Sequence, residues 1–253
     1  MATSIISNSA AIGKDTIIGE FCVIGDKVNI GINTVIGHNV TIHADTIIGD
    51  NVRIDDGTVI GKLPMRAANS AVTKDQKLPP CKIGSDCIIG ANAVIYRGSD
   101  IDQKVLVADL ATVRENVKIG RKTIVGRGVA IENYCNIGKY CKLETNSYIT
   151  AYSDLEDRVF IAPCVATSND NYVGRTEKRF KNFKGVIVRK GARIGVNATI
   201  LPGKEIGEDS LVAASALVHK DVPAGKIVAG IPGKAIKDVP EEQLLKNQGW
   251  KDD

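Results

Sequence analysis

The chain has 253 residues, of which 43% are apolar and only 4% aromatic, and its formal net charge is +4. No basic tract stands out, which argues against a nucleic-acid-binding arm. Since most globular cores rely on Phe, Trp and Tyr for buried area, this core must be built mainly from Ile, Val and small residues.

The N-terminal stretch MATSIISNSAAIG lacks the basic region and apolar core of a secretory signal. No run of about 18 apolar residues predicts a membrane span. Six cysteines follow neither a metal-binding nor a disulfide spacing, and four of them (Cys22, Cys87, Cys135, Cys141) share one position of a repeat. We therefore expect a cytoplasmic protein with reduced, buried cysteines and no bound metal.

An aliphatic residue recurs at every sixth position along most of the chain. One run extends from Ile6 to Ile60, a second from Ile83 to Thr167 and a third from Val188 to Val218. Glycine often follows the aliphatic residue, and a small or β-branched residue stands four positions after it. The phase is lost over about 62–82 and about 173–187, where we expect polar loops.

A period of six does not suit an α-helix, whose faces recur at 3.6 residues. It predicts short flat strands separated by corners, with the aliphatic side chain inward and glycine allowing the backbone to turn beside it. Three sides would close a triangular coil of 18 residues, and stacked coils would lie about 4.8 Å apart. Aliphatic residues 18 apart would then form continuous inner columns.

After the repeats, the stretch DVPEEQLLKNQGW predicts a short helix. Pro240 suits the first helical position, Glu241 and Glu242 suit the first turn, and Gly249 suits the exit. A solenoid needs its ends covered, so we expect this helix to cap the open end of the stack.

The pattern resembles the hexapeptide-repeat family, whose members form left-handed parallel β-helices. The resemblance covers residue 6 to about residue 236. It implies an all-β solenoid over residues 1–236 with two inserted loops, followed by a C-terminal helix and tail over residues 237–253.

Members of that family are often acyltransferases that use a coenzyme A thioester, while others are carbonic anhydrases or scaffolds. The anhydrase reaction needs three histidines on one metal, whereas this chain has only His38, His43 and His219, the last of them far along the stack. None stands in the middle coils, where a histidine general base would be expected. The acceptor should therefore be an amine, since a sugar hydroxyl needs a true base.

The stretch Gly230-Ile231-Pro232-Gly233-Lys234 resembles the Gly-x-Pro-Ala-Lys turn of coenzyme A-dependent members, with Gly233 replacing alanine. The resemblance implies a homotrimer that binds acetyl-CoA along the seam between subunits. It assigns the coenzyme site to small residues beside the pantetheine and to residues of the closing turn (Ala162, Ala213, Ala214, Lys226, Pro232, Lys234). The alternative explanation for each lysine is a purely structural role in the turn by which the chain leaves the last coil.

Polar residues replace the repeat glycine on consecutive coils, in columns 18 residues apart. These columns predict a polar groove that binds substrate, with candidates Tyr96, Arg97, Asp109, Arg114 and Glu132. In the second insertion, Arg179 and Phe183 belong to a basic and aromatic stretch that suits a nucleoside diphosphate, with a subunit interface as the alternative.

The stretch KLETNSYI and the TSNDN that follows are similar to nucleotide-linked amino-sugar N-acyltransferases, closest to those that acetylate dTDP-3-amino-3,6-dideoxyhexoses. The resemblance implies catalytic roles for Glu144, Asn146, Asn169 and Asp170. Glu144 would orient the acceptor amine, and the asparagines would position the amine, a hydroxyl or the thioester carbonyl.

The sequence thus predicts an acetyl-CoA-dependent N-acetyltransferase that acts on a nucleotide-linked deoxysugar without a histidine base or metal. Alternatives are an N-acyltransferase for a 4-amino or UDP-linked sugar, a hydroxyl acyltransferase, and a non-catalytic binding solenoid. A nucleotidyltransferase appendage is disfavoured, because no Gly-rich nucleotide domain is recognisable before the repeats.

Overall fold

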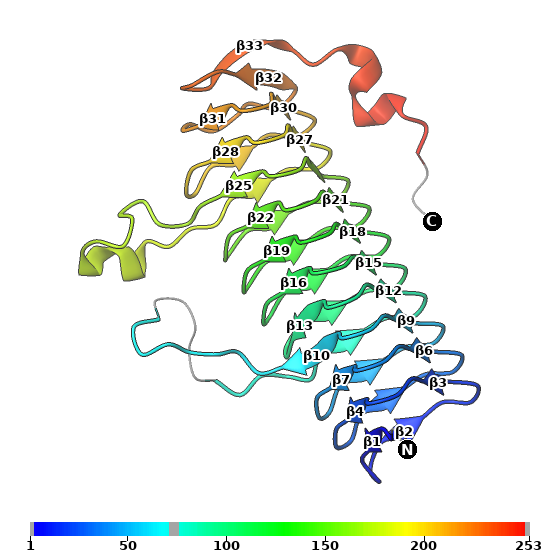
Figure 1. Cartoon of the computed structure of the whole chain (residues 1–253). Helices are drawn as coiled ribbons and strands as arrows, with labels where there is room; N and C mark the ends of the chain where they lie inside the picture. The colour runs from blue at the N-terminus through cyan, green and yellow to red at the C-terminus, as the bar shows by residue number, and fades with distance from the viewer. Residues whose placement is uncertain (1–2, 71–75, 251–253) are drawn as a thin grey trace.

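The computed structural model describes residues 3–70 and 76–250, which form a left-handed parallel β-helix. The chain climbs a triangular prism whose three sides are parallel sheets, and it passes from sheet A to sheet B to sheet C in each coil (Figure 1). Residues 18 apart pair in register on successive coils, as Thr112 pairs with Ala130. The predicted period and architecture are therefore confirmed.

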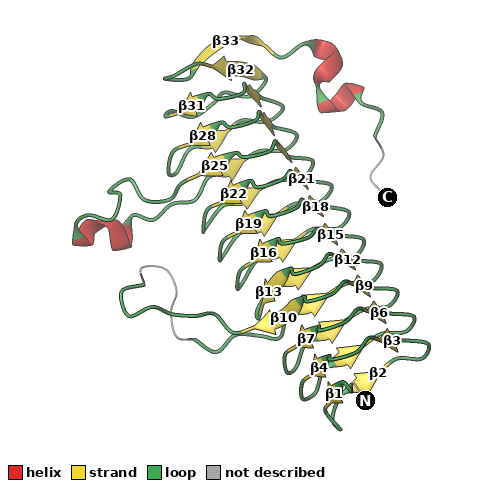
Figure 2. Ribbon diagram, in the orientation of Figure 1, coloured by secondary structure: helices red, strands yellow, loops and turns green. Residues whose placement is uncertain are grey.

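Within the described residues, most strands are two residues long (Figure 2). Sheet A contains β1 (Ile5–Ile6), β4 (Val23–Ile24), β7 (Thr41–Ile42), β10 (Val59–Lys62), β13 (Val94–Tyr96), β16 (Thr112–Val113), β19 (Ala130–Ile131), β22 (Tyr148–Ile149), β25 (Ala166–Thr167), β28 (Thr199–Ile200) and β31 (Leu217–Val218). Sheet B contains β2 (Ala11–Ile12), β5 (Asn29–Ile30), β8 (Ile47–Ile48), β11 (Lys82–Ile83), β14 (Asp100–Ile101), β17 (Lys118–Ile119), β20 (Asn136–Ile137), β23 (Asp154–Leu155), β26 (Ile187–Val188) and β29 (Glu205–Ile206). Sheet C contains β3 (Ile17–Ile18), β6 (Val35–Ile36), β9 (Arg53–Ile54), β12 (Ile88–Ile89), β15 (Leu106–Val107), β18 (Ile124–Val125), β21 (Lys142–Leu143), β24 (Phe160–Ile161), β27 (Arg193–Ile194), β30 (Leu211–Val212), β32 (Lys226–Ala229) and the antiparallel β33 (Lys234–Asp238).

The second residue of nearly every strand points inward and, away from the first coil, is almost completely buried. The small residue four positions later is buried as well, including Cys22, Cys87, Cys135 and Cys141. Burial raises the pKa of Cys135 and of Cys141 to about 12, so these thiols are inert fillers as predicted.

The repeat glycine has a different role from the one expected. At Gly13 the backbone is not left-handed, but a Cβ atom would lie 2.4 Å from the carbonyl carbon of Gly31 on the next coil. Close stacking therefore selects glycine. The left-handed turn falls two residues later, at positions such as Asn33 (φ 54°), where Asn and Asp are tolerated.

Two insertions leave the prism at the same edge, which we name the A–B corner because it holds the turns between sheet A and sheet B. The first runs between β10 and β11 and the second between β25 and β26, where it contains the 3-10 helix η1 (Glu177–Lys181) (Figure 1). The equivalent edge between sheet C and sheet A is named the C–A corner.

The C-terminal segment forms two 3-10 turns, η2 (Glu241–Gln243) and η3 (Leu245–Asn247), rather than one continuous helix. It also lies beside the prism, not over its end: the amide of Leu245 donates to Asp209 Oδ1 at 3.1 Å and Arg193 Nη1 donates to Gln243 Oε1 at 3.0 Å. The expected end cap is therefore corrected, because β33 pairs with β32 at the last rung instead.

Candidate active site

Charged and aromatic residues follow one another up the A–B corner between the two insertions. Lys62, Tyr96, Arg114 and Glu132 lie on successive coils, each directly after a strand of sheet A or at its end. The ammonium of Lys62 lies 4.9 Å from the centroid of the Tyr96 ring, and the guanidinium of Arg114 lies 5.0 Å from it. Tyr96 is buried, so its ring supports both cations from within the corner.

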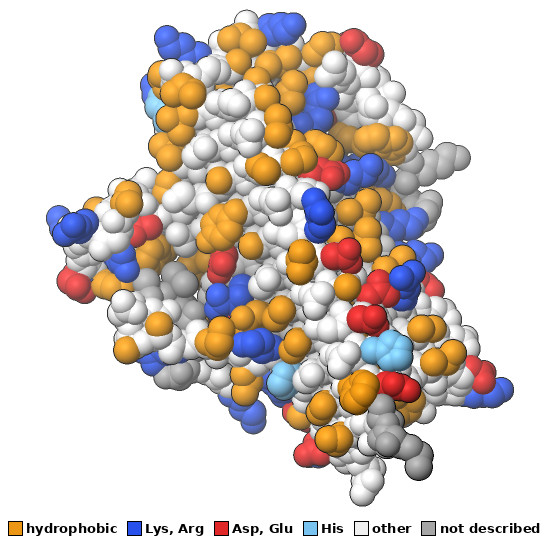
Figure 3. Space-filling model, viewed as in Figure 1, with side chains coloured by type: hydrophobic (Ala, Val, Ile, Leu, Met, Phe, Trp, Pro, Cys, Tyr) orange, Lys and Arg blue, Asp and Glu red, His pale blue; other side chains and the backbone are white. Residues whose placement is uncertain are grey.

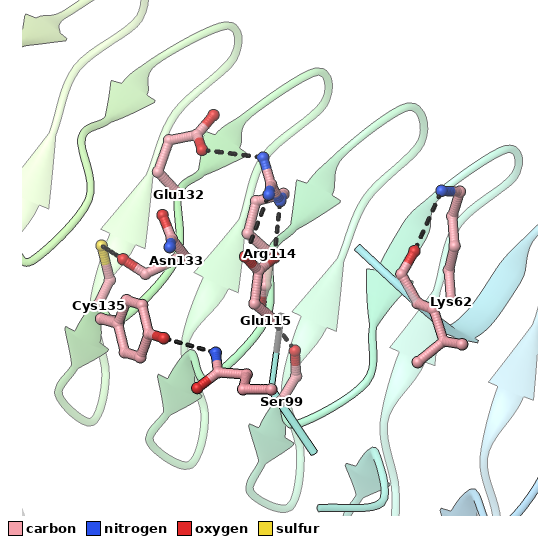
Figure 4. A network of polar contacts seen from close by, with 10 residues as sticks. Lys62, Ser99, Arg114, Glu115, Glu132, Asn133 and Cys135 are labelled. Carbon is pink, nitrogen blue, oxygen red and sulfur yellow. Dashed lines mark hydrogen bonds and ion pairs between the residues drawn. The ribbon is translucent and has the colours of Figure 1, made fainter. Parts of the chain in front are cut away.

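Arg114 joins two carboxylates (Figure 4). Its Nε and Nη2 donate to the two oxygens of Glu115 at 2.8 and 3.1 Å, and its Nη1 donates to Glu132 Oε2 at 3.3 Å. Glu115 is 1% exposed, whereas Glu132 reaches the surface. Burial raises the pKa of Glu132, Arg114 opposes that rise, and Glu115 adds to it. Burial alone would lower the pKa of Arg114, but the two acids outweigh it.

The second insertion closes a small pocket over this column. A cavity of about 250 Å³ is lined by a carboxylate, two aromatic rings, an amide and an ion pair, contributed by Glu132, Tyr148, Ala151, Asn169, Asp170, Arg179 and Phe183. Five of these seven residues were predicted site residues, which the fold gathers from sheet A and from the insertion. Figure 3 shows the insertion projecting beside this surface, with basic side chains at its outer edge.

Asp170 holds the insertion in shape. Its Oδ1 accepts from the amide of Tyr172 at 2.8 Å, and its Oδ2 accepts from the amide of Gly174 at 2.9 Å and from Arg179 Nη1 at 3.4 Å. The Gly174 amide, the Tyr172 amide and the Arg179 charge together lower the pKa of Asp170. Arg179 also lies 5.8 Å from the centroid of Phe183, so these residues form one ordered wall.

The other two predicted catalytic residues lie at the C–A corner. Glu144 follows β21 and is half-buried, and its carboxylate has no side-chain partner among residues 3–70 and 76–250. Asn146 is exposed and has φ 59°, a left-handed conformation that asparagine tolerates. Within one chain, the strands of sheet A separate this corner from Asn169 and Asp170.

Two predicted substrate-binding residues, Arg97 and Asp109, make hydrogen bonds within the chain. All three guanidinium nitrogens of Arg97 are engaged, with Leu78 O at 3.1 Å, Ala44 O at 2.7 Å and Asp45 Oδ2 at 2.8 Å. Arg97 therefore ties the first insertion to the corner. Asp109 lies at the C–A corner, where its Oδ1 accepts from the amide of Ala91 on the coil below at 2.9 Å.

The predicted coenzyme residues also lie at the C–A corner or near the last coil. Ala162 and Ala213 continue the column of Glu144 upward, and Ala214 is the next residue of the same corner. The closing turn is fixed by the amide of Gly233, which donates to Leu217 O at 2.8 Å. Lys226 pairs with Asp238, while Pro232 and Lys234 are exposed.

No group of three or more His, Cys, Asp or Glu side chains suited to a metal ion occurs among the described residues. The described chain likewise contains no helix of the length and apolarity needed to span a bilayer.

Family models match three parts of the chain. Residues 27–62 match the bacterial transferase hexapeptide with six repeats, and residues 80–108 and 185–218 match the hexapeptide repeat of succinyl-transferase. These three matched stretches all lie in coils of the β-helix.

The curated relatives match this chain only in part. The bifunctional protein GlmU of Rubrobacter xylanophilus is 28% identical over 63% of this chain and 35% of its own length. The 2,3,4,5-tetrahydropyridine-2,6-dicarboxylate N-acetyltransferase of Staphylococcus aureus is 48% identical over 25% of this chain and 26% of its own. The chain thus spans about a third or less of the curated relatives it matches.

Among solved structures, the match to the UDP-N-acetylglucosamine O-acyltransferase (LpxA) of Moraxella catarrhalis covers 98% of this chain and 77% of that chain. The TM-score is 0.55 and the sequence identity 21%, so this similarity concerns the fold.

Sequence reasoning missed Tyr148 and gave no role to Glu115. Tyr148 occupies the outward position of β22, where neighbouring strands of sheet A carry Ala130 and Ala166, so a large side chain between two small ones was the available signal. Glu115 was visible only as a polar corner residue, and its near-complete burial could not be predicted from the repeat.

Proposed function

We propose that this protein is an acyl-CoA-dependent N-acyltransferase that transfers an acetyl group to the amine of a nucleotide-linked deoxysugar. The observation that carries the proposal is the pocket beneath the second insertion, where Glu132 and Asn169 lie with Arg179 and Phe183. A carboxylate and an amide suit an amino sugar, whereas a cation and a ring suit its nucleoside diphosphate. The partial matches to succinyl-transferase repeats and to an N-acetyltransferase support the reaction class.

For the acceptor we propose a dTDP-3-amino-3,6-dideoxyhexose, on the similarity of the segment around Glu144 to enzymes that act on such sugars. By analogy with an α-amino group, whose pKa is about 8, roughly a tenth of the amine is neutral at pH 7. The neutral nitrogen forms a bond to the thioester carbonyl carbon, and the carbon–sulfur bond breaks. The departing coenzyme A thiolate takes the proton, so no histidine base is required.

Glu144 would orient the amine and balance the positive charge of the tetrahedral intermediate, while Asn169 contacts the acceptor and backbone N–H groups stabilise the oxyanion. Because Glu144 and Asn169 lie on different corners of one prism, we propose a homotrimer in which the C–A corner of one subunit opposes the A–B corner of the next. Coenzyme A would then lie beside Ala162, Ala213 and Ala214. The unpaired cysteines suit a reducing compartment, so we propose a cytoplasmic location.

The direct test is a mass-spectrometric endpoint assay. The protein is mixed with acetyl-CoA and a panel of dTDP- and UDP-linked 3-amino and 4-amino deoxysugars, each with its hydroxyl analogue. We expect one acetyl mass increment on a dTDP-linked 3-amino sugar and none on its hydroxyl counterpart. Unchanged sugars together with an absence of coenzyme A binding would make the chain a non-catalytic solenoid.

Subunit mixing tests the shared site. Glu144→Gln and Asn169→Ala are each expected to lower turnover, about a hundredfold if Glu144 acts as a base and less if it only orients the amine. When the two variants are unfolded, mixed and refolded together, trimers gain sites in which both corners are intact. Activity above that of either variant is expected, and an absence of recovery would contradict the shared site.

A further inference from the structure

A cavity outside the proposed active site lies beneath the C-terminal segment. Its volume is about 590 Å³, and its floor is the outer face of sheet C around Lys142 and Arg193. Its sides are the neighbouring corner residues Tyr140 and Arg158, and its roof ends at Trp250. Sheet C is a different side of the prism from the A–B corner, so this cavity is separate from the pocket under the second insertion.

The roof is built onto the prism by specific contacts. Arg193 Nη1 donates to Gln243 Oε1 at 3.0 Å, and the amide of Leu245 donates to Asp209 Oδ1 at 3.1 Å. Gly191 lies under Leu245, since a Cβ atom at Gly191 would lie 2.3 Å from Leu245 Cδ1. The packing of η3 on this glycine fixes the height of the roof above sheet C.

The cavity is strongly cationic. Its described lining carries four basic side chains, Lys122, Lys142, Arg158 and Arg193, against the single carboxylate of Glu242. Arg193 Nη2 is buried and has no hydrogen-bond partner among the described residues, although Nη1 of the same group is bonded. A buried donor left without an acceptor is costly, and an anionic ligand oxygen would supply one.

Aromatic rings stand beside these cations. The guanidinium carbon of Arg158 lies 4.5 Å from the ring centroid of Tyr140 and 5.3 Å from that of Trp250. The side chain of Trp250 is 61% exposed, which leaves ring surface for a planar ligand to stack on. Cations for phosphate and an accessible indole for a base occur together in one cavity.

We propose that this cavity binds a nucleoside carrying one or more phosphates. Pockets for small ligands measure about 300–1,000 Å³, so 590 Å³ suits one nucleotide. A nucleic-acid strand would need cations along an extended groove, whereas these converge on one hollow. The ligand could be the phosphorylated nucleoside end of a coenzyme or a free nucleotide. The site stands whether or not the protein transfers acyl groups.

The chain itself supplies the reporter, because Trp250 is its only tryptophan. Tryptophan fluorescence is followed while the full chain is titrated with adenosine 3′,5′-bisphosphate, dTDP, thymidine or inorganic phosphate in separate experiments. We expect a saturable change with at least one of the two nucleotides and at least tenfold weaker responses to thymidine and phosphate alone. A response only to the adenosine bisphosphate assigns the site to the coenzyme end, and a response only to dTDP assigns it to a free nucleotide.

Two variants and one control make the test specific. Lys142→Ala and Arg193→Gln should each weaken nucleotide binding about tenfold, the effect of losing one charge-assisted contact. Lys142→Ala leaves the Arg193–Gln243 hydrogen bond of the roof intact, so its effect does not depend on the roof. Lys118 occupies the equivalent outward strand position on sheet B, and Lys118→Ala should leave affinity unchanged. The proposal is overturned if neither nucleotide changes the fluorescence, if phosphate alone binds as tightly as a nucleotide, or if Lys142→Ala and Arg193→Gln bind like the parent chain.

Discussion

Replacing Glu115 by alanine tests whether the polar column at the A–B corner is held by a buried ion pair. Glu115 is 1% exposed and accepts two hydrogen bonds from Arg114, whose side chain is 18% exposed. The substitution leaves in place the contact of the guanidinium with the carboxylate of Glu132, at 3.3 Å. It therefore removes the shorter contacts and retains the longer one.

The expected cost follows from burial. Removing one partner of a buried ion pair typically costs about 3–5 kcal/mol, because the remaining charge stays desolvated. Since Glu132 still compensates Arg114 in part, we expect the lower end, about 3 kcal/mol. For a chain of this size, that corresponds to a fall in melting temperature of about 6–12 °C. Glu115→Gln, which keeps the volume and loses the charge, should fall between Glu115→Ala and the parent chain.

The control is an ion pair with a similar shortest N–O distance and a different exposure. Arg189 Nε lies 2.7 Å from Glu205 and keeps a second carboxylate, Glu156, just as Arg114 keeps Glu132. The side chains of Arg189 and Glu205 are 39% and 42% exposed, so Glu205→Ala should leave the melting temperature nearly unchanged. Thermal unfolding followed by circular dichroism compares the two. Equal shifts for Glu115→Ala and Glu205→Ala would refute the reasoning, because distance rather than burial would then set the effect.

Three further predictions concern the second insertion and the thiols. Asp170→Asn should accelerate amide hydrogen exchange at Tyr172 and Gly174, measured by mass spectrometry. In the parent chain, this protection should persist above the ordinary pKa of 3.8 and disappear only as pH falls through the lowered native pKa of Asp170. Gly185→Ala should lower the melting temperature by several degrees, since its Cβ would lie 2.2 Å from the carbonyl carbon of Tyr152; an unchanged value would contradict that clash. A thiol reagent should modify only Cys164 in the native protein, and modification of more than one thiol would contradict the burial of the other five.

The fold could be predicted because its rule is local and repeated. Each coil needs an inward aliphatic residue and a small residue in the corner, and both requirements are visible in the sequence at intervals of six. The role of glycine was misjudged, since the contact between Gly13 and Gly31 joins residues 18 apart and is visible only once the coils are stacked. The C-terminal helix was misplaced for a related reason: nothing in its own sequence indicates that Leu245 packs over Gly191.

The candidate site was harder to predict, because outward corner residues are free to vary for structural as well as functional reasons. Arg97 and Glu132 occupy adjoining columns of the same corner and looked equivalent in the sequence. The structure separates them, since Arg97 binds backbone carbonyls of Leu78 and Ala44 whereas Glu132 faces the pocket. Asn169 and Phe183 come from the second insertion, whose path no repeat determines.

The acidic residues at these corners differ in how many of their carboxylate oxygens accept hydrogen bonds from the protein, and an oxygen without such a bond is free to bind a ligand. One oxygen of Asp109 accepts a hydrogen bond from a backbone amide of the coil below, and both oxygens of Asp170 accept hydrogen bonds from amides of its own loop. One oxygen of Glu132 accepts a hydrogen bond from Arg114, and the carboxylate of Glu144 accepts none from any side chain in the described part of the structure. Holding an acid at a corner without a partner adds nothing to the stability of the coil. A ligand that carries an amine would give Glu144 a partner and Glu132 a second one, and because these residues lie on different corners, it would reach both only where two copies of the prism meet.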